Sequence, residues 1–389
     1  MKYSLGILLA ATKDSAFTIG TLLINIKDKM DVSQTIFYII NDGFDQNDKL
    51  IMQKLVPNIK FMDFTIDDFE AKIKKFNADY KLNRQSSILN RYTHMSYARF
   101  EALKFLKECE CIIYLDFDML LLKGIDELKE VKNKGYEVAC FRGSATMGHG
   151  GGKLVPANLI HVNNYSAGII VFSNNLKNSQ EFYDFIYQFI AENDDYFLEV
   201  KLGDQFLFSL YLLQENLKIY ELDDSYYGNI SWVKSKDASI LHAWGSNNRF
   251  WNNKLCALAW PSWNVYYQKW LSLGGSAYEK GFVSFLEVPQ SGGEVFQYFE
   301  RIVLAKRISQ IKLEKQELII DIDFSKKIKL HLAFIEELVF YVYSKSIFTF
   351  ILECEFQGKI TRSITIKRSE LESVLKEFIQ DNLHQYQIK

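Results

Sequence analysis

CIIYLDFDMLLL, residues 111–122, is an apolar run that only two carboxylates, Asp116 and Asp118, interrupt. In a single β-strand successive side chains alternate between the two faces, so both carboxylates would point the same way. Two ionised carboxylates in apolar surroundings are costly unless a cation or hydrogen bonds compensate for their charge. The run therefore predicts a divalent metal ion bound at the end of a buried strand, as in a metal-dependent enzyme.

The segments before this run alternate between strand-like and helix-like patterns. We expect strands at residues 4–11, 34–40 and 59–64, and helices at residues 16–28, 47–55 and 96–107. Strands separated by helices indicate βαβ units and therefore an α/β fold with a mostly parallel sheet. Ligands bind such sheets beyond the carboxyl ends of the strands. The loop at residues 12–17 and the two aspartates both follow such ends.

The overall composition limits the class of protein. The 389-residue chain has 48% hydrophobic residues and can bury a large core. Its net charge of −2 does not indicate a surface that binds nucleic acid. No apolar run approaches the ~18 residues of a membrane span. Five scattered cysteines without zinc-ligand spacing predict reduced thiols in a cytoplasmic protein. Residues 2–11 resemble a signal peptide superficially, but polar residues follow at once and favour a first buried strand.

A glycine cluster, GHGGG at residues 148–152, lies in a stretch without clear periodicity. The pattern favours a flexible surface loop, and a mobile flap over an acceptor is the functional alternative. A Walker-type phosphate loop requires Gly-Lys followed by Ser or Thr. Because Leu154 follows Gly152 and Lys153, the cluster is not such a loop.

The composition changes near residue 290, where PQSGG at residues 289–293 is the best boundary candidate. The chain beyond it reads as a separate small α+β module. A hairpin turn is expected at residues 357–359, and a last helix from Ser369. Strands are expected at residues 318–324, 329–335, 338–343, 347–356 and 360–367.

A lone Asp-x-Asp pair is a weak signal because it occurs by chance in many proteins. The chain contains a second copy, Asp321 and Asp323, for which an ordinary strand is the better interpretation. Specificity for Asp116 and Asp118 must therefore come from the sequence around them.

Six sequence blocks surround and follow the two aspartates. They are SYARF (96–100), IIYLDFD (112–118), LLKGIDEL (121–128), NYSAGI (164–169), GDQFL (203–207), and LHAWG (241–245) followed by RFW (249–251). In content and order the blocks resemble glycosyltransferase family 8, which includes glycogenin and the bacterial lipooligosaccharide galactosyltransferases. The similarity extends over about residues 3–260, two thirds of the chain.

The resemblance implies a GT-A fold, in which a Rossmann-like, mostly parallel sheet is flanked by helices. It divides the chain into three expected parts. Residues 1–260 form the nucleotide-sugar transferase domain, 261–293 a helical connection, and 294–389 the C-terminal α+β module of unknown role.

A metal site formed by Asp116, Asp118 and His242 is also implied by the resemblance. A divalent ion bound to a diphosphate acts as a Lewis acid for the charge that develops on this leaving group. Mn²⁺ accepts an imidazole ligand more readily than Mg²⁺, so His242 favours Mn²⁺. The alternative for His242 is a satisfied core or loop histidine.

The donor implied by the resemblance is a UDP-sugar, and the transfer is retaining. Asp204 and Gln205 would be catalytic, with Gln205 stabilising an oxocarbenium-like species; a helix N-cap is the alternative for Asp204. Arg99 would contact the donor sugar and diphosphate, with a surface salt bridge as its alternative. The expected donor-site residues are Ala10, Thr12, Asp14, Phe17, Arg99, Asp116, Phe117, Asp118, Gly245 and Arg249.

The chain departs from the family pattern at several positions. Ser166 stands where the family has Asn, and Phe17 stands for a Tyr that contacts the base. Arg249 stands where Lys is expected, one residue late, so either Asn248 or Arg249 takes the phosphate-contacting position. Arginine can hold a diphosphate as lysine does, and bidentately.

The resemblance to bacterial members implies a glycan or lipid-linked glycan acceptor in surface polysaccharide or lipopolysaccharide synthesis. Such an acceptor implies peripheral association with the inner face of the membrane. Two alternatives remain. One is a degenerate glycosyltransferase fold that serves as a sugar-binding or scaffold protein. The other is a haloacid-dehalogenase-like phosphatase, whose motif wants Thr or Val where Leu120 stands.

Overall fold

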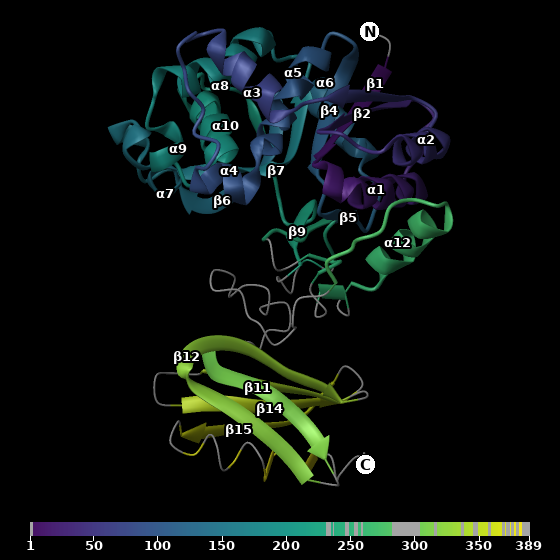
Figure 1. Ribbon diagram of the computed structural model, residues 1–389, viewed down its shortest axis with the longest axis vertical. Coiled ribbons are helices and arrows are strands. Elements are labelled where there is room, and N and C mark those ends of the chain that lie inside the picture. Colours follow the sequence, from purple (N-terminus) through teal and green to yellow (C-terminus); the bar gives the residue numbers. More distant parts are fainter. Residues whose placement is uncertain are drawn as a thin grey trace. The chain divides into compact units, whose positions relative to one another are not determined.

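The computed structural model describes residues 3–230, 235, 237–245, 249–252, 256–257 and 260–281 (Figure 1). In the C-terminal part it describes the strands between residues 304 and 367 and residues 370, 374, 377–378 and 381–382. The chain forms two compact units. The first contains Met1–Tyr227, Ala238–His242 and Pro261–Glu279, and the second contains Gly228–Asp237, Ala243–Trp260 and Lys280–Lys389.

A seven-stranded sheet forms the centre of the first unit, in the order β3-β2-β1-β4-β7-β6-β8. Strands β1 to β4 pair in parallel, and β7 is antiparallel to both of its neighbours. The strands of this sheet are β1 (Tyr3–Ala11), β2 (Thr35–Asn41), β3 (Ile59–Asp63), β4 (Cys109–Asp116), β6 (Val138–Thr146), β7 (Asn163–Ser173) and β8 (Ile219–Leu222). The predicted α/β fold with a mostly parallel sheet is confirmed.

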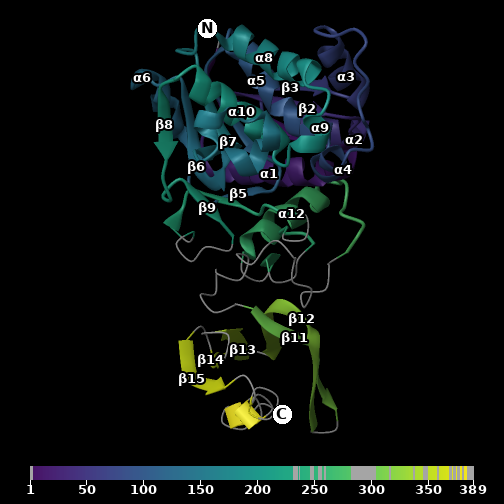
Figure 2. The same ribbon diagram turned by 90° about the vertical axis from the view of Figure 1, so that its left-hand side faces the viewer.

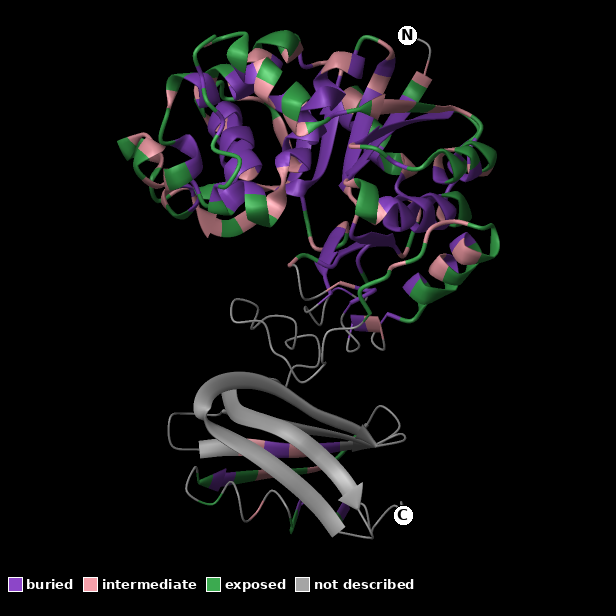
Figure 3. Cartoon of the chain, viewed as in Figure 1, coloured by how far each residue is buried: buried purple, intermediate pink, exposed green. Residues whose placement is uncertain are grey.

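Helices cover both faces of this sheet, and the buried residues of Figure 3 lie mainly in the strands and on the facing sides of the helices. On one face pack α3 (Ile66–Lys74), α4 (Ser87–Tyr92), α5 (Ala102–Phe105), α8 (Ser179–Glu192) and α10 (Gly203–Gln214) (Figures 1 and 2). Helix α1 (Ala16–Lys29) covers the other face, and α2 (Gln46–Leu55) and α12 (Ser262–Ser272) pack against α1. No helix in the described part of the chain is long and apolar enough to cross a bilayer.

The predicted helix at residues 96–107 is present, but most of it is a 3₁₀ helix and not an α-helix. The segment forms a 3₁₀ helix, η2 (His94–Glu101), followed by the short helix α5. All residues of η2 except Ser96 are buried, and Arg99 Nε donates to the Ser96 carbonyl oxygen at 2.7 Å. The burial of η2 indicates that tertiary packing favours the tighter 3₁₀ geometry here.

The run at residues 111–122 is not one strand. Strand β4 ends at Asp116, the chain turns at Phe117 and Asp118, and β5 (Met119–Leu121) enters a second sheet. This three-stranded sheet has the order β5-β10-β9, with β10 at Ile240–His242 and β9 at Tyr227–Asn229. The expected alternation of Asp116 and Asp118 on one strand is therefore wrong. The turn directs both carboxylates to a common point instead.

The glycine cluster is not a surface loop. It forms α7 (Met147–Gly151) and a 3₁₀ turn, and Gly150 and Gly151 are buried. A Cβ on Gly151 would lie 2.2 Å from Cε2 of Phe206 in α10. The glycines are needed here because the backbone of α7 lies directly against α10.

Five antiparallel strands form a sheet within the second unit, in sequence order: β11 (Leu304–Glu314), β12 (Glu317–Ile335), β13 (Leu338–Ser344), β14 (Thr349–Phe356) and β15 (Lys359–Lys367). Phe356 pairs with Lys359, which confirms the predicted hairpin turn. Two predicted strands form the single strand β12, and β11 was not predicted. The boundary candidate at residues 289–293 and the start of the last helix at Ser369 lie outside the described residues.

Candidate active site

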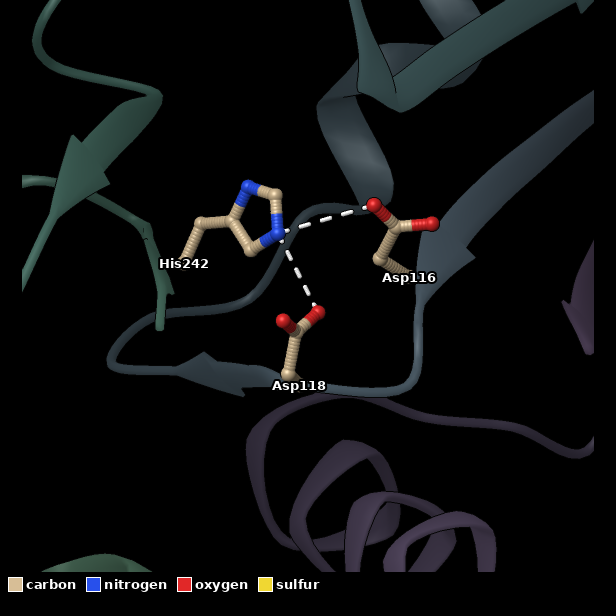
Figure 4. A group of neighbouring side chains, drawn as sticks. All are labelled: Asp116, Asp118 and His242. Atoms are coloured by element: carbon tan, nitrogen blue, oxygen red, sulfur yellow. Dashed lines mark ion pairs between the residues drawn. The ribbon is translucent and has the colours of Figure 1, made fainter. Parts of the chain in front are cut away.

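Asp116, Asp118 and His242 converge at the carboxyl end of β4 (Figure 4). His242 Nε2 lies 3.1 Å from Asp118 Oδ1 and 3.5 Å from Asp116 Oδ2. The antiparallel pairing of β10 with β5 places His242 opposite Met119, directly after Asp118. The sheet therefore brings His242 to two aspartates that lie far from it in the sequence.

The chemistry of these three side chains fits a divalent cation. Their ligand atoms lie within 4.8 Å of one another, and Asp118 and His242 are only 2% and 6% exposed. Two carboxylates that face one point, Asp118 buried and Asp116 half-buried, are disfavoured without a positive charge. Two carboxylate oxygens and an imidazole nitrogen suit Mn²⁺ better than Mg²⁺. Asp116, Asp118 and His242 would hold such an ion.

The second oxygen of Asp116 is engaged by the protein. Tyr114 donates its hydroxyl to Asp116 Oδ1 at 2.5 Å, and Arg99 Nη2 lies 3.1 Å from the same oxygen. Alternation along β4 places Tyr114 and Asp116 on one face of the strand. These two contacts fix the carboxylate so that Oδ2 faces His242.

Arg99 is buried between two carboxylates, which contradicts the alternative of a surface salt bridge. Besides Asp116 it meets Asp204 Oδ2 through Nη1 at 3.1 Å, and Nη1 also donates to the Ala167 carbonyl oxygen. Its guanidinium lies over the Tyr114 ring, 4.7 Å from the ring centre. Burial disfavours its charge, but Asp116 and Asp204 outweigh burial and raise the pKa of Arg99.

Asp204 and Gln205 lie in the first turn of α10, near the metal-site candidates. Burial raises the pKa of Asp204, while the neighbouring Arg99 charge opposes that shift. The N-cap of α10 is Leu202, so Asp204 is not the N-cap residue. Gln205 is half-buried beside it. Arg99 therefore connects Asp204 to Asp116.

The first loop begins beside the same strand end. Ala10 pairs with Asp116 across β1 and β4, and Thr12 and the exposed Asp14 follow it. Phe17 is in α1 and only 2% exposed. Its ring packs against Tyr267 and Tyr278, with centroids 5.7 and 5.4 Å away. Contact between Phe17 and a base therefore stays a prediction.

Two predicted diphosphate contacts, Gly245 and Arg249, lie in the second unit. Gly245 has a positive φ of 101°, a conformation that favours glycine. Asn248, the rival of Arg249 for the phosphate contact, lies outside the described residues. The roles of these residues stay predictions.

The sequence did not point to two residues that support the site. Tyr114 could have been found, because it precedes Asp116 by two positions on the same strand face. Tyr227 carries no such signal. Its hydroxyl lies 2.5 Å from His242 Nδ1, a contact made only when β9 and β10 lie side by side.

The central sheet is similar to those of solved glycosyltransferases. A structure of the bifunctional glycosyltransferase WbbM matches with a TM-score of 0.52 and 12% identity, over 70% of this chain and 52% of WbbM. The chain thus spans about half of the WbbM chain. The galactosyltransferase LgtC, in complex with donor and acceptor sugar analogs, matches with a TM-score of 0.50 and 14% identity, over 69% of this chain and 99% of LgtC. At these identities the likeness shows the fold alone, a GT-A fold.

Sequence comparison provides the family. No curated protein matches the chain in sequence. The family model "Glycosyl transferase family 8" matches residues 6–254 and so contains every candidate site residue. Because this match covers more than half of the chain, the protein belongs to glycosyltransferase family 8 and is a glycosyltransferase.

Proposed function

We propose that the protein is a metal-dependent, retaining hexosyltransferase that moves a hexose from a UDP-sugar to a glycan acceptor. The observation that carries this proposal is the convergence of Asp116, Asp118 and His242 at the carboxyl end of β4. The first loop, which begins after Ala10, starts at the same place. A diphosphate bound there would lie between the three converging residues and the first loop.

The three converging residues would hold Mn²⁺, or Mg²⁺ less favourably. When bound, such an ion supplies Lewis-acid stabilisation for the charge of the departing diphosphate. Ala10, Thr12, Asp14, Phe17 and Phe117 are the proposed contacts of the nucleoside side of the donor. Gly245 and Arg249 are the proposed contacts of the diphosphate, because guanidinium suits phosphate oxygens.

Asp204 and Gln205 are proposed to lie beneath the anomeric carbon of the donor sugar. The bond between this carbon and the diphosphate oxygen breaks, and positive charge develops on the sugar ring. The Gln205 amide oxygen stabilises that charge while the acceptor hydroxyl attacks from the face of departure. On that face the departing diphosphate is the nearest base, so it receives the hydroxyl proton.

The proposed acceptor is a surface glycan or its lipid-linked precursor, used in the cytoplasm at the inner face of the membrane. We also propose the division into residues 1–260, 261–293 and 294–389, in which the last part binds the acceptor, the membrane surface or a second subunit. The chain belongs to a glycosyltransferase family and has a GT-A fold, and both argue against the phosphatase alternative. The joint presence of Asp116, Asp118, His242 and Gln205 favours an active enzyme over the degenerate, sugar-binding or scaffold alternative.

Nucleotide binding and turnover test this proposal. We expect UDP to raise the melting temperature only in the presence of Mn²⁺, and one or more UDP-sugars to be hydrolysed slowly. Asp118→Asn should remove both responses. Asp321→Asn, in the second Asp-x-Asp sequence, is the matched control and should keep both. UDP binding without turnover on any sugar would indicate the degenerate alternative, and no response to UDP would overturn the proposal.

A further inference from the structure

We infer that Tyr227 is a positioning residue of the metal site, which holds the imidazole of His242 with Nε2 directed at Asp116 and Asp118. This inference rests on the proposed metal dependence. The rings of Tyr227 and His242 are both buried, with 5% and 6% of these residues exposed. All four residues belong to the first compact unit.

The two nitrogens of His242 face different partners. Nε2 faces the carboxylates at 3.1 and 3.5 Å, and Nδ1 faces the Tyr227 hydroxyl at 2.5 Å. A neutral imidazole binds a cation through the nitrogen that carries no proton. For Nε2 to be the ligand, the ring proton must be on Nδ1. The Tyr227 oxygen is placed to accept it.

A phenol hydroxyl suits the hydrogen bond with His242 Nδ1 better than a group that can only accept. Without a cation, the ring proton on Nε2 can be donated to Asp118, and Tyr227 then donates its hydroxyl to Nδ1. With a cation on Nε2, Nδ1 donates to the Tyr227 oxygen instead. Rotation of the Tyr227 hydroxyl about its C–O bond therefore keeps this hydrogen bond both with and without the cation. A carboxylate or a carbonyl could only accept a hydrogen bond.

Packing leaves the His242 ring little room to move elsewhere. A Cβ on Gly168 would lie 2.6 Å from His242 Cε1 and 2.9 Å from Nδ1, so the backbone of β7 lies directly against the ring. The Tyr227 ring meets His242 edge-on, with centroids 5.7 Å apart, and packs on Phe141 at 4.9 Å. The hydroxyl of Tyr227 is thus itself held in place.

The test is Tyr227→Phe in the full chain, with Mn²⁺ alone as the probe and free Mn²⁺ measured by electron paramagnetic resonance. Phenylalanine keeps the ring packing and removes only the hydroxyl. Loss of such a supporting partner weakens metal binding by about 10–100-fold, and we expect a weakening in this range. Tyr226→Phe is the matched control, because the neighbouring hydroxyl is directed at Glu127 and its loss should leave Mn²⁺ affinity unchanged.

Two further measurements separate positioning from a general effect on folding. In a His242→Ala background, Tyr227→Phe should weaken Mn²⁺ binding by less than about twofold, because the ligand through which it acts is gone. At saturating Mn²⁺, the spin-echo modulation from an imidazole nitrogen should be present in the wild type, reduced in Tyr227→Phe and absent in His242→Ala.

Equal Mn²⁺ affinity of Tyr227→Phe and the wild type would overturn the inference and leave the proposed function intact. A full additional loss in the His242→Ala background would also overturn it, since Tyr227 would then act on the fold rather than on the ring. If the wild type itself does not bind Mn²⁺, the proposed metal dependence fails first, and the inference fails with it.

Discussion

Arg99 connects two carboxylates with different proposed roles, Asp116 at the metal site and Asp204 near the sugar. Breaking a buried ion pair by removing one partner leaves an uncompensated charge and costs about 3–5 kcal/mol. Removal of Arg99 would therefore leave Asp204 as a buried carboxylate without its cationic partner. Burial nevertheless raises the pKa of Asp204, because Arg99 opposes the desolvation only in part.

This raised pKa predicts a pH-dependent stability. An unfolded aspartate titrates near ~3.9. Since the folded pKa of Asp204 lies higher, the stability that it contributes is full below about pH 4 and is lost as the pH rises through the folded value. Asp204→Asn cannot ionise and lacks this change. We expect the unfolding free energy of the wild type minus that of Asp204→Asn to fall as the pH rises above about 4, measured by urea titration with a chelator present.

Asp223 offers a control of opposite sign. Hydrogen bonds from Ser225 lower the pKa of this exposed carboxyl, so its stabilising effect is present above about pH 4 and is lost in acid. The difference between the wild type and Asp223→Asn should therefore rise with pH up to about pH 4 and stay constant above it. A difference for Asp204→Asn that is flat or also rises would contradict the assigned pKa direction.

Among the elements, β7 supports the site with its backbone, since the Ala167 carbonyl accepts from Arg99 and Gly168 lies against His242. The β6–β7 ladder shifts register on both sides of the pair Arg142–Tyr165. Helix α10 compensates there, because the buried Ser209 hydroxyl accepts from Tyr165 N at 2.8 Å. One helix thus fixes the site strand and also presents Asp204.

Ser209→Ala is expected to disturb β7 next to the site. The buried Tyr165 N–H would lose its partner, which lowers the unfolding free energy by about 1–3 kcal/mol. Sugar transfer should slow as well, because Ala167 and Gly168 follow directly. Stability by urea titration and kcat of sugar transfer, at a temperature where the variant is folded, are the measurements.

Ser173→Ala is the matched variant at the other end of β7, where the hydroxyl donates to the Tyr136 carbonyl oxygen at 2.6 Å. It should lower stability without slowing transfer. If both variants slow transfer equally, or neither does, α10 does not act on the site through β7.

Elements with a strong local period were predictable from the sequence, and those determined by distant contacts were not. Strands β1 and β2 and helix α1 follow from continuous apolar runs and helical periodicity. The break at Phe117 did not show, because Met119–Leu121 is as apolar as β4 and only its pairing with β10 diverts it. His242 entered through the family pattern, whereas Tyr227 depends on pairing of strands far from β4 and left no trace in the sequence.

At the scale of the whole molecule, the chain leaves the first unit after His242 and returns to it at Pro261. The intervening segment carries Gly245 and Arg249, the proposed diphosphate contacts. Its first end is fixed by β10, and its second end leads directly into α12. Helix α12 is held on α1 by Trp270, which is fully buried against Gly20. The segment therefore begins after one residue of the first unit and ends before another.

Trp270→Ala tests whether the packing of α12 on α1 supports donor binding. Removing a buried tryptophan leaves a cavity and costs about 3–5 kcal/mol, so the unfolding free energy should fall by a similar amount. We also expect weaker UDP binding in calorimetry at a temperature where the variant is folded, because Phe17 of α1, a proposed donor contact, packs on Tyr267 of α12 and would lose that support. Val265→Ala, on the same helix but 54% exposed, should change neither quantity. Unchanged UDP affinity in a destabilised Trp270→Ala would show that α12 stabilises the first unit without contributing to the donor site.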